Sequence, residues 1–314
     1  MVYLLSLAVL FSQYMIINHP YNHVVFHNAI SGQPQYVASD QDTIYFVSSK
    51  QVLACSKIGK KFVKKTLYLD VPRHPLAFFA DRNYLWLCQA DSQVQRYNLS
   101  KGKFDFNVHV NTKNISTFMY DARNGYILTG TYDGNLDIYS IDRKISPKHL
   151  RLSQGGYAIT SLSVSPKSNT LCATIFDRQC ALLDLVTFRV ICNVQLEMSP
   201  MNACFDSHHK DFLVADGNNI VRFSDKGGQF AKVLSSWPER IEHIYLGSSG
   251  DLIFASSRSI KSGPNSTNSP MSLQLLRDGK VMNIGLTWCH YAALTADRKK
   301  FAYFNAEREA VVME

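Results

Sequence analysis

One short alternating run recurs seven times along the 314-residue chain, and this recurrence limits the possible folds more than any other feature. Each copy is a run of four mainly apolar or aromatic residues that follows a polar turn. The copies lie at 44–47, 84–87, 126–129, 171–174, 212–215, 252–255 and 301–304. Successive copies are about 40 to 50 residues apart, which is the length of a supersecondary unit. The chain is therefore predicted to be an array of seven similar units.

The best-formed unit contains residues 125–142, GYILTGTYDGNLDIYSID. Two alternating runs flank an Asp-Gly pair, Asp133 and Gly134, which is a strong hairpin signal because glycine accepts the positive φ of a tight turn. We therefore predict that Asp133 and Gly134 are structural turn residues.

Each unit has the same four parts. A candidate first strand, such as 159–164, precedes the polar turn, and third and fourth runs follow the indexed second run. The chain is 46% hydrophobic and 12% aromatic, a bias that suits the pleated surface of strands. A Gly, Pro, Ser and Asn-rich insertion at 259–270 lengthens the sixth unit. This pattern predicts an all-β fold, a seven-bladed β-propeller of four-stranded antiparallel blades.

The seventh unit lacks a fourth run because the sequence stops at Glu314. An uncharged N-terminal strand is expected to supply it, either 15–18 or, better placed, 23–27. Such a strand would close the ring and remove an open sheet edge. The predicted division is an apolar segment at 1–33 and a propeller at 34–314.

The apolar N-terminal segment has alternative interpretations. Residues 2–11 have the length of a signal-peptide core and are too short to span a bilayer. If residues 1–16 are a signal peptide, the protein is secreted or lumenal; docking of the segment on the domain is preferred. A third possibility is that the chain is part of a longer protein.

The units resemble the WD-repeat family over about residues 35–314. The resemblance rests on an aspartate in the turn followed by a residue pair at the end of the third strand: Asp91 with Tyr97-Asn98, Asp133 with Tyr139-Ser140, and Asp177 with Leu183-Asp184. No unit carries the family's Trp-Asp pair or its Gly-His dipeptide. The resemblance implies a rigid platform that binds peptides or domains on its faces, as in the C-terminal propellers of larger trafficking or scaffold proteins.

Five residues in turns and linkers are predicted to bind a partner. They are Trp237, Arg240, Arg82, Arg123 and Arg178. Tryptophan and arginine are concentrated in interface hot spots, and arginine suits an acidic or phosphorylated peptide. The alternative is that these arginines are ordinary solvated turn residues. Membrane contact is expected only indirectly, through partners.

No catalytic or metal-binding spacing is found in the sequence, so we predict a non-enzymatic protein without a cofactor. A propeller-type hydrolase with a metal at the channel mouth is the first alternative. Nucleic-acid binding, raised by the formal net charge of +8, is the second. The densest basic cluster, at 57–65, instead suits an edge strand. Seven cysteines without a C-x-x-C pair favour free thiols and a cytoplasmic location.

Overall fold

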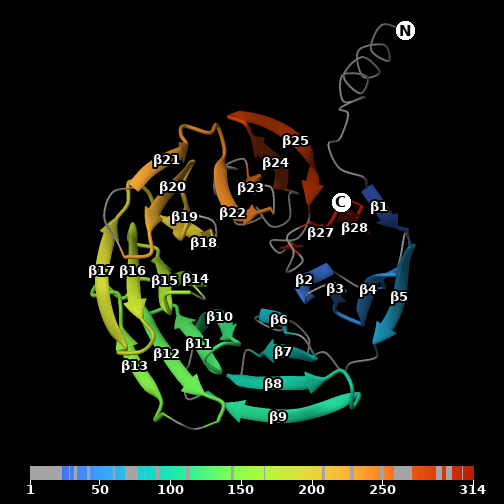
Figure 1. The fold of residues 1–314 in the computed structure, drawn as a ribbon, viewed down its shortest axis with the longest axis horizontal. Helices are drawn as coiled ribbons and strands as arrows, with labels where there is room; N and C mark the ends of the chain where they lie inside the picture. Colours follow the sequence, from blue (N-terminus) through green and yellow to red (C-terminus); the bar gives the residue numbers. More distant parts are fainter. Residues whose placement is uncertain are drawn as a thin grey trace, which may run out of the picture.

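Seven sheets of four strands form a closed ring in the computed structural model (Figure 1). The structure describes residues 23–314 except for 28, 32–33, 41–42, 59–60, 68–76, 82, 90–91, 111–113, 143–144, 166, 207–208, 227–229, 248–250, 258–270, 288–291, 295–298 and 306. The predicted all-β, seven-bladed propeller is therefore confirmed. Among the described residues, no helix is long and apolar enough to cross a membrane.

Blades 1 to 3 follow one another along the chain, and each runs outward from the ring axis (Figure 1). Their strands are β2 (Pro34–Asp40), β3 (Thr43–Ser48), β4 (Val52–Ile58) and β5 (Lys61–Leu67); β6 (Ala77–Asp81), β7 (Tyr84–Cys88), β8 (Gln93–Asn98) and β9 (Lys103–His109); and β10 (Ile115–Asp121), β11 (Tyr126–Thr131), β12 (Asn135–Ser140) and β13 (Lys148–Arg151).

Blades 4 to 6 repeat this arrangement. Their strands are β14 (Ile159–Ser165), β15 (Thr170–Ile175), β16 (Gln179–Asp184) and β17 (Arg189–Gln195); β18 (Pro200–Asp206), β19 (Asp211–Asp216), β20 (Asn219–Ser224) and β21 (Phe230–Leu234); and β22 (Arg240–Leu246), β23 (Leu252–Ser257), β24 (Met271–Arg277) and β25 (Lys280–Thr287). The predicted insertion falls between β23 and β24, outside the described residues.

Blade 7 contains both ends of the described chain. It consists of β26 (Ala293–Leu294), β27 (Phe301–Phe304), β28 (Ala310–Met313) and β1 (His23–Phe26). Strand β1 pairs antiparallel with β28 in the register His23 to Met313 through Phe26 to Ala310. A side-chain contact of 2.8 Å between His27 Nδ1 and Glu309 Oε1 extends the pairing. The predicted closing strand at 23–27 is confirmed, whereas the alternative at 15–18 lies outside the described residues.

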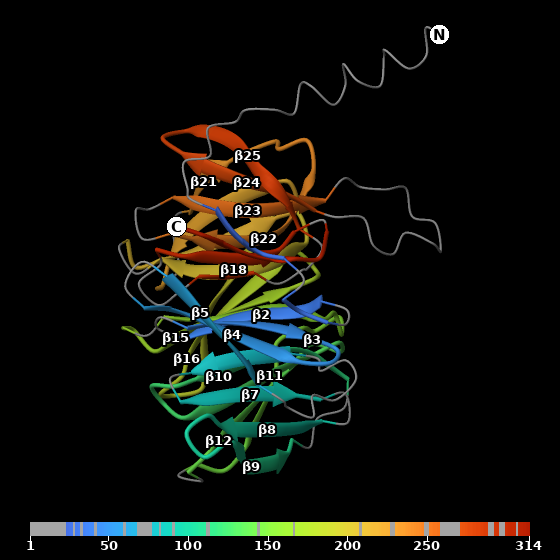
Figure 2. The ribbon, with the colours of Figure 1, turned by 90° about the vertical axis from the view of Figure 1, so that its right-hand side faces the viewer.

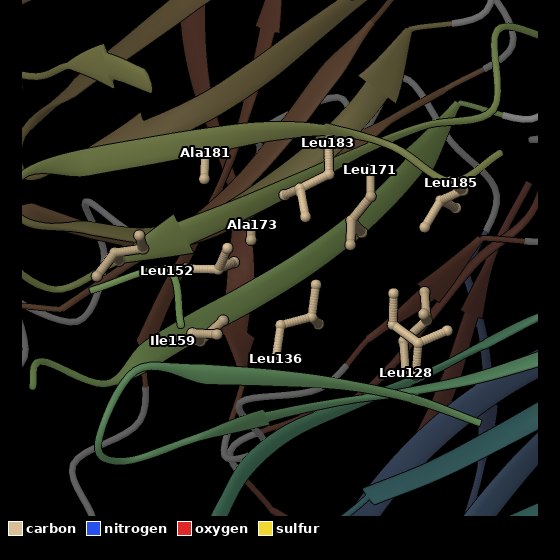
Figure 3. Packing of buried hydrophobic residues seen from close by; sticks show 11 residues of the cluster. Leu128, Leu136, Leu152, Ile159, Leu171, Ala173, Ala181, Leu183 and Leu185 are labelled. Atoms are coloured by element: carbon tan, nitrogen blue, oxygen red, sulfur yellow. The ribbon is translucent and has the colours of Figure 1, made fainter. Parts of the chain in front are cut away.

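The hydrophobic core is divided into seven clusters, one at each junction between neighbouring blades. Figure 3 shows the junction of blades 3 and 4, where Leu128 and Leu136 face Leu171 and Leu183. All four side chains are fully buried. Because a blade buries each face only against a neighbour, no blade has a complete core by itself. Ring closure through β1 therefore completes the cluster between blades 7 and 1, in which Phe26 packs near Phe46.

Polar contacts between first strands fix the spacing of the blades. Four first strands carry an irregularity after their first residue and β22 carries one after its second, which are β-bulge positions. The residue at this position in blades 3 and 4 donates to the next blade: Ser116 Oγ to Ile159 O, at 2.6 Å, and Thr160 Oγ1 to Pro200 O, at 2.9 Å. In these two blades the bulge directs a short polar side chain across the blade junction.

Polar residues at the ends of third strands stabilise the next turn. Asn98 Oδ1 accepts hydrogen bonds from the backbone of Ser100 and Lys101, and Asp184 Oδ1 accepts from Val186 N at 2.7 Å. The hydrogen bond from Val186 N lowers the pKa of Asp184. The residue-pair positions of the WD resemblance therefore contain turn caps.

The antiparallel blades give the ring two different faces, and Figure 2 shows it edge-on. We call the side where each first strand begins the start face, and the opposite side the end face. The turns between second and third strands, and the connections between blades, lie on the start face. The other two sets of turns lie on the end face. A turn residue is thus assigned to a face by its place in the blade.

The outermost strand of blade 1 carries much of the basic cluster. Lys61, Lys64 and Lys65 lie on β5, the edge of its sheet, as the sequence predicts. Lysine on an edge strand opposes pairing with another sheet. Lys57 on β4 forms an ion pair of 2.5 Å with Glu314, and the fifth member, Lys60, lies outside the described residues. The basic cluster therefore protects the outer sheet edge of blade 1, and through Lys57 it also contributes to ring closure.

Candidate partner-binding surface

Four exposed apolar side chains gather on the start face over blades 3 to 5. Tyr132 is 62% exposed, Tyr157 49%, Phe176 43% and Met198 48%. We call these four residues the start-face patch. The three aromatic residues among the exposed large hydrophobic residues of the described chain all belong to it. Exposed aromatic and methionine side chains grouped on one face are typical of interaction surfaces.

The turn of blade 3 presents Tyr132. This turn consists of Tyr132, Asp133 and Gly134, and Gly134 has a φ of 82°. Thr131 holds the turn closed, because its Oγ1 donates to Asp133 and accepts from Asn135 N at 2.9 Å. Asp133 and Gly134 therefore lie in the predicted hairpin turn, and Tyr132 projects from a fixed backbone.

The connection from blade 3 to blade 4 carries Tyr157 between two turns. Leu152 N donates to Gly134 O at 2.9 Å, which attaches the connection to the turn of blade 3. At its other end, Ala158 O accepts from Phe176 N at 2.9 Å, which attaches it to the turn of blade 4. Tyr157 is thereby held beside Phe176 in the backbone framework of the start face.

The turn of blade 4 is formed by Phe176, Asp177 and Arg178. Arg178 has a φ of 67°, and its carbonyl oxygen accepts from Leu196 N at 2.8 Å. Ser153 Oγ donates to Asp177 Oδ2 at 3.4 Å, whereas Asp177 Oδ1 is buried without a hydrogen-bond partner among the described residues. The side chains of Phe176 and Arg178 remain exposed. The turn thus presents an aromatic ring and a cation two residues apart.

A buried carboxylate in blade 5 positions Met198. Asp216 Oδ1 accepts from Met198 N at 2.7 Å, and Oδ2 accepts from Glu197 N at 3.1 Å. Burial raises the pKa of Asp216, and the two backbone hydrogen bonds act against this shift. The Met198 side chain also lies against Gly217, where an added Cβ would approach Met198 Cβ to 2.6 Å. Met198 therefore has a defined place at the edge of the patch.

Two of the predicted partner-binding residues lie together on the start face at blade 6. Trp237 is half-buried: its ring packs on Phe254 at 5.3 Å and its Nε1 donates to Ser256 Oγ at 3.3 Å. Arg240 lies at the beginning of β22, with Nε 3.8 Å from Glu242 Oε1. Both side chains thus have intramolecular contacts at the junction of blades 5 and 6.

The other predicted arginines do not form one site. Arg178 lies on the start face, whereas Arg123 is exposed on the end face, in the turn between β10 and β11. Arg82 lies outside the described residues, as does Asp91 among the predicted turn residues. The structure therefore brings Arg178, and not Arg123, close to the start-face patch.

Three histidine–carboxylate pairs lie elsewhere in the described chain. One joins two strands, one lies within a turn and one lies at the ring closure. His149 Nδ1 lies 2.7 Å from Asp137 Oδ1 across β12 and β13, and His209 Nδ1 lies 2.6 Å from Asp206 Oδ2 within one turn. The third pair is the His27 contact at the ring closure. No group of three potential metal ligands occurs among the described residues.

The aromatic residues of the patch were missed by reasoning from the sequence. A signal was present, because Tyr132-Asp133 and Phe176-Asp177 are aromatic–aspartate pairs at equivalent turns. Tyr157 and Met198 carry no comparable signal, since they lie in connections whose path depends on neighbouring blades. Only the packed ring shows that the four residues share a face.

Comparisons with known proteins identify the fold. The sequence matches no protein-family description and no curated protein. A structure of streptogramin B lyase is similar, with a TM-score of 0.71 and 12% identity over 94% of this chain and 97% of the lyase chain. The β-propeller domain of Myceliophteria thermophila Cps50 (Swd1) has a TM-score of 0.70 and 12% identity over 93% of this chain and 99% of that domain. At this identity the likeness concerns the fold alone.

Proposed function

We propose that this protein is a non-catalytic, WD-repeat-like interaction platform that binds a protein or peptide at the start-face patch. The observation that carries the proposal is the exposure of Tyr132, Tyr157, Phe176 and Met198 on one face. Aromatic and methionine side chains bury large apolar areas when a partner covers them. Hydrogen bonds hold the backbone of the turns and connections that carry these residues. Binding would therefore cost little conformational entropy in this part of the chain.

The polar groups of the ring support a scaffold role. The carboxylates of Asp137, Asp206 and Glu309 each contact a histidine within a strand pair, a turn or the ring closure. Asp216 and Asp184 hold backbone N–H groups. These titratable groups have structural tasks, so we assign the function to the exposed apolar surface.

We attribute the net positive charge of the chain to solubility and to protection of the exposed sheet edge. We therefore propose a protein partner and not nucleic acid. Three lysines of the densest cluster lie on the edge strand β5, away from the patch on blades 3 to 5. An apolar interface predicts binding that changes little with salt, whereas phosphate contacts predict a steep decrease. We also propose an intracellular location, supported by the six free cysteines among the described residues.

A comparative pull-down tests the proposed surface. The bait proteins are the wild type, a Tyr157→Ser/Phe176→Ser variant and an Ile191→Ser control, since Ile191 is 45% exposed on the outer strand β17. Partners identified by mass spectrometry are then purified and their affinity is measured at two salt concentrations. We expect at least about tenfold weaker binding by the patch variant and unchanged binding by the control. Equal binding by the wild type and the patch variant contradicts the proposal.

A further inference from the structure

Arg178 occupies a backbone position that favours glycine. Its φ of 67° lies in the left-handed region, where side chains other than those of glycine and asparagine are disfavoured. The equivalent position of blade 3, directly before the third strand, is Gly134, with a φ of 82°. Blade 4 thus retains an arginine where the turn itself would accept glycine.

The fold uses the backbone of Arg178 and not its guanidinium. Its carbonyl accepts the N–H of Leu196, and Gly134 makes the same bond with Leu152 in blade 3. The Arg178 side chain is exposed, and no hydrogen bond or ion pair joins it to another described residue. Stability therefore explains the conformation of residue 178 but gives no reason for its charge.

The carboxylates around the patch are already engaged. Asp133 accepts from Thr131 and Asn135. Asp177 Oδ2 accepts from Ser153 at 3.4 Å, and its Oδ1 is buried, out of reach of a partner among the described residues. Glu197 forms an ion pair of 2.8 Å with Lys232. Arg178, two residues from the exposed Phe176, is thus the charged side chain of these turns that has no hydrogen bond or ion pair within the described chain, and its guanidinium complements an anionic group next to an apolar one.

We propose that Arg178 binds a carboxylate of an extended peptide in which an aspartate or glutamate lies close to a large apolar residue. The apolar residue would pack on Phe176 and Tyr157, and the carboxylate would meet the planar guanidinium, which forms paired charge-assisted hydrogen bonds. This inference rests on the proposed function, since it specifies the partner of the same surface. It makes Arg178 the residue that determines specificity within the patch.

A displayed library of random linear peptides provides the test. Immobilised wild-type protein is expected to select peptides that contain Asp or Glu near Phe, Leu, Ile or Trp. The selected peptide is then synthesised and its affinity is measured for the wild type, Arg178→Gly, Arg178→Lys and Arg123→Ala. Arg178→Gly should weaken binding by about tenfold or more, Arg178→Lys less, and the end-face control Arg123→Ala not at all.

The choice of glycine keeps the test interpretable. The turn at 178 already has the conformation that glycine prefers, so loss of binding by Arg178→Gly cannot be assigned to a broken turn; an unchanged unfolding curve checks this. Failure to select any peptide contradicts the proposed function itself. Selection of apolar peptides without an acidic residue, or equal binding by Arg178→Gly, overturns only the role of Arg178. Tighter binding of a phosphoserine version of the peptide would replace the carboxylate with a phosphate and also overturn the inference.

Discussion

Gly134 and Arg178 occupy the same place in consecutive blades: each has a left-handed backbone, and each carbonyl accepts the N–H of the residue that follows the fourth strand. The turn geometry is therefore preserved although glycine tolerates a left-handed backbone and arginine disfavours it. This relationship separates what the turn needs from what the exposed surface presents.

Replacement of Arg178 by glycine should not lower the stability of the protein. A left-handed conformation costs an L-residue roughly 1 to 2 kcal/mol, and the greater flexibility of glycine in the unfolded chain offsets about half of this. We expect the melting temperature to stay constant or rise by up to about 2 °C, measured by calorimetry. A clear decrease would show that the guanidinium stabilises the fold.

Replacement of Gly134 by alanine should destabilise the blade strongly. An added Cβ would lie 2.4 Å from Ser153 Cβ and 2.7 Å from Tyr157 O, and φ is already positive. Strain and overpacking together predict a loss of about 2 to 4 kcal/mol in urea unfolding. Gly125→Ala is the matched control, because Gly125 has a φ of 66° but nothing within 4 Å of the added atom. Equal losses in the two variants would contradict the packing argument.

The ion pair of Asp105 should make stability depend on pH. Arg96 Nε lies 2.8 Å from Asp105 Oδ1, and Asn98 Nδ2 donates to Oδ2 at 2.8 Å. Burial acts to raise the pKa of Asp105, but the hydrogen bonds from Asn98 and Arg96 bring it below its ordinary value. A lowered pKa in the folded state means that the stabilisation is present above the ordinary value and is lost as pH falls through the folded-state value.

Asp105→Asn is therefore expected to unfold at lower urea concentration than the wild type at pH 7, by about 1 to 2 kcal/mol. The difference should decrease below about pH 4, as the wild-type carboxyl becomes protonated. Asp278→Asn, at an exposed turn, removes a carboxylate without this pair and serves as the control. A difference between Asp105→Asn and the wild type that does not vary with pH would exclude the ionised pair as its cause.

Removal of β1 should open the ring. Chains that begin at residue 23 and at residue 29 differ by β1 and the His27–Glu309 contact. The shorter chain loses the strand that covers β28 and part of the core between blades 7 and 1, including Phe26. We expect it to be insoluble or to melt without cooperativity, whereas the longer chain keeps a single transition. Identical melting curves of the two chains would show that β1 is dispensable.

Much of the fold was predictable because its signals are local. The second strands, the Asp133-Gly134 turn and the basic edge strand β5 were all indicated by alternation, turn residues or charge. The closing strand was predictable because one blade lacked a fourth run and a short apolar segment was available. Trp237 was predicted to bind a partner because of its residue type and its place in the linker before a first strand, and the structure places its ring against Phe254.

The sequence by itself determined the number of blades, their strand order and the turns that join them, since these depend on side-chain alternation and on residues with special φ preferences. The tertiary structure decided which turns share a face and which side chains remain exposed there. Tyr132, Tyr157 and Phe176 share the start face because backbone hydrogen bonds attach the connection between blades 3 and 4 to the turns of both blades. Those bonds exist only when the blades pack, because each blade buries its apolar faces against its neighbours.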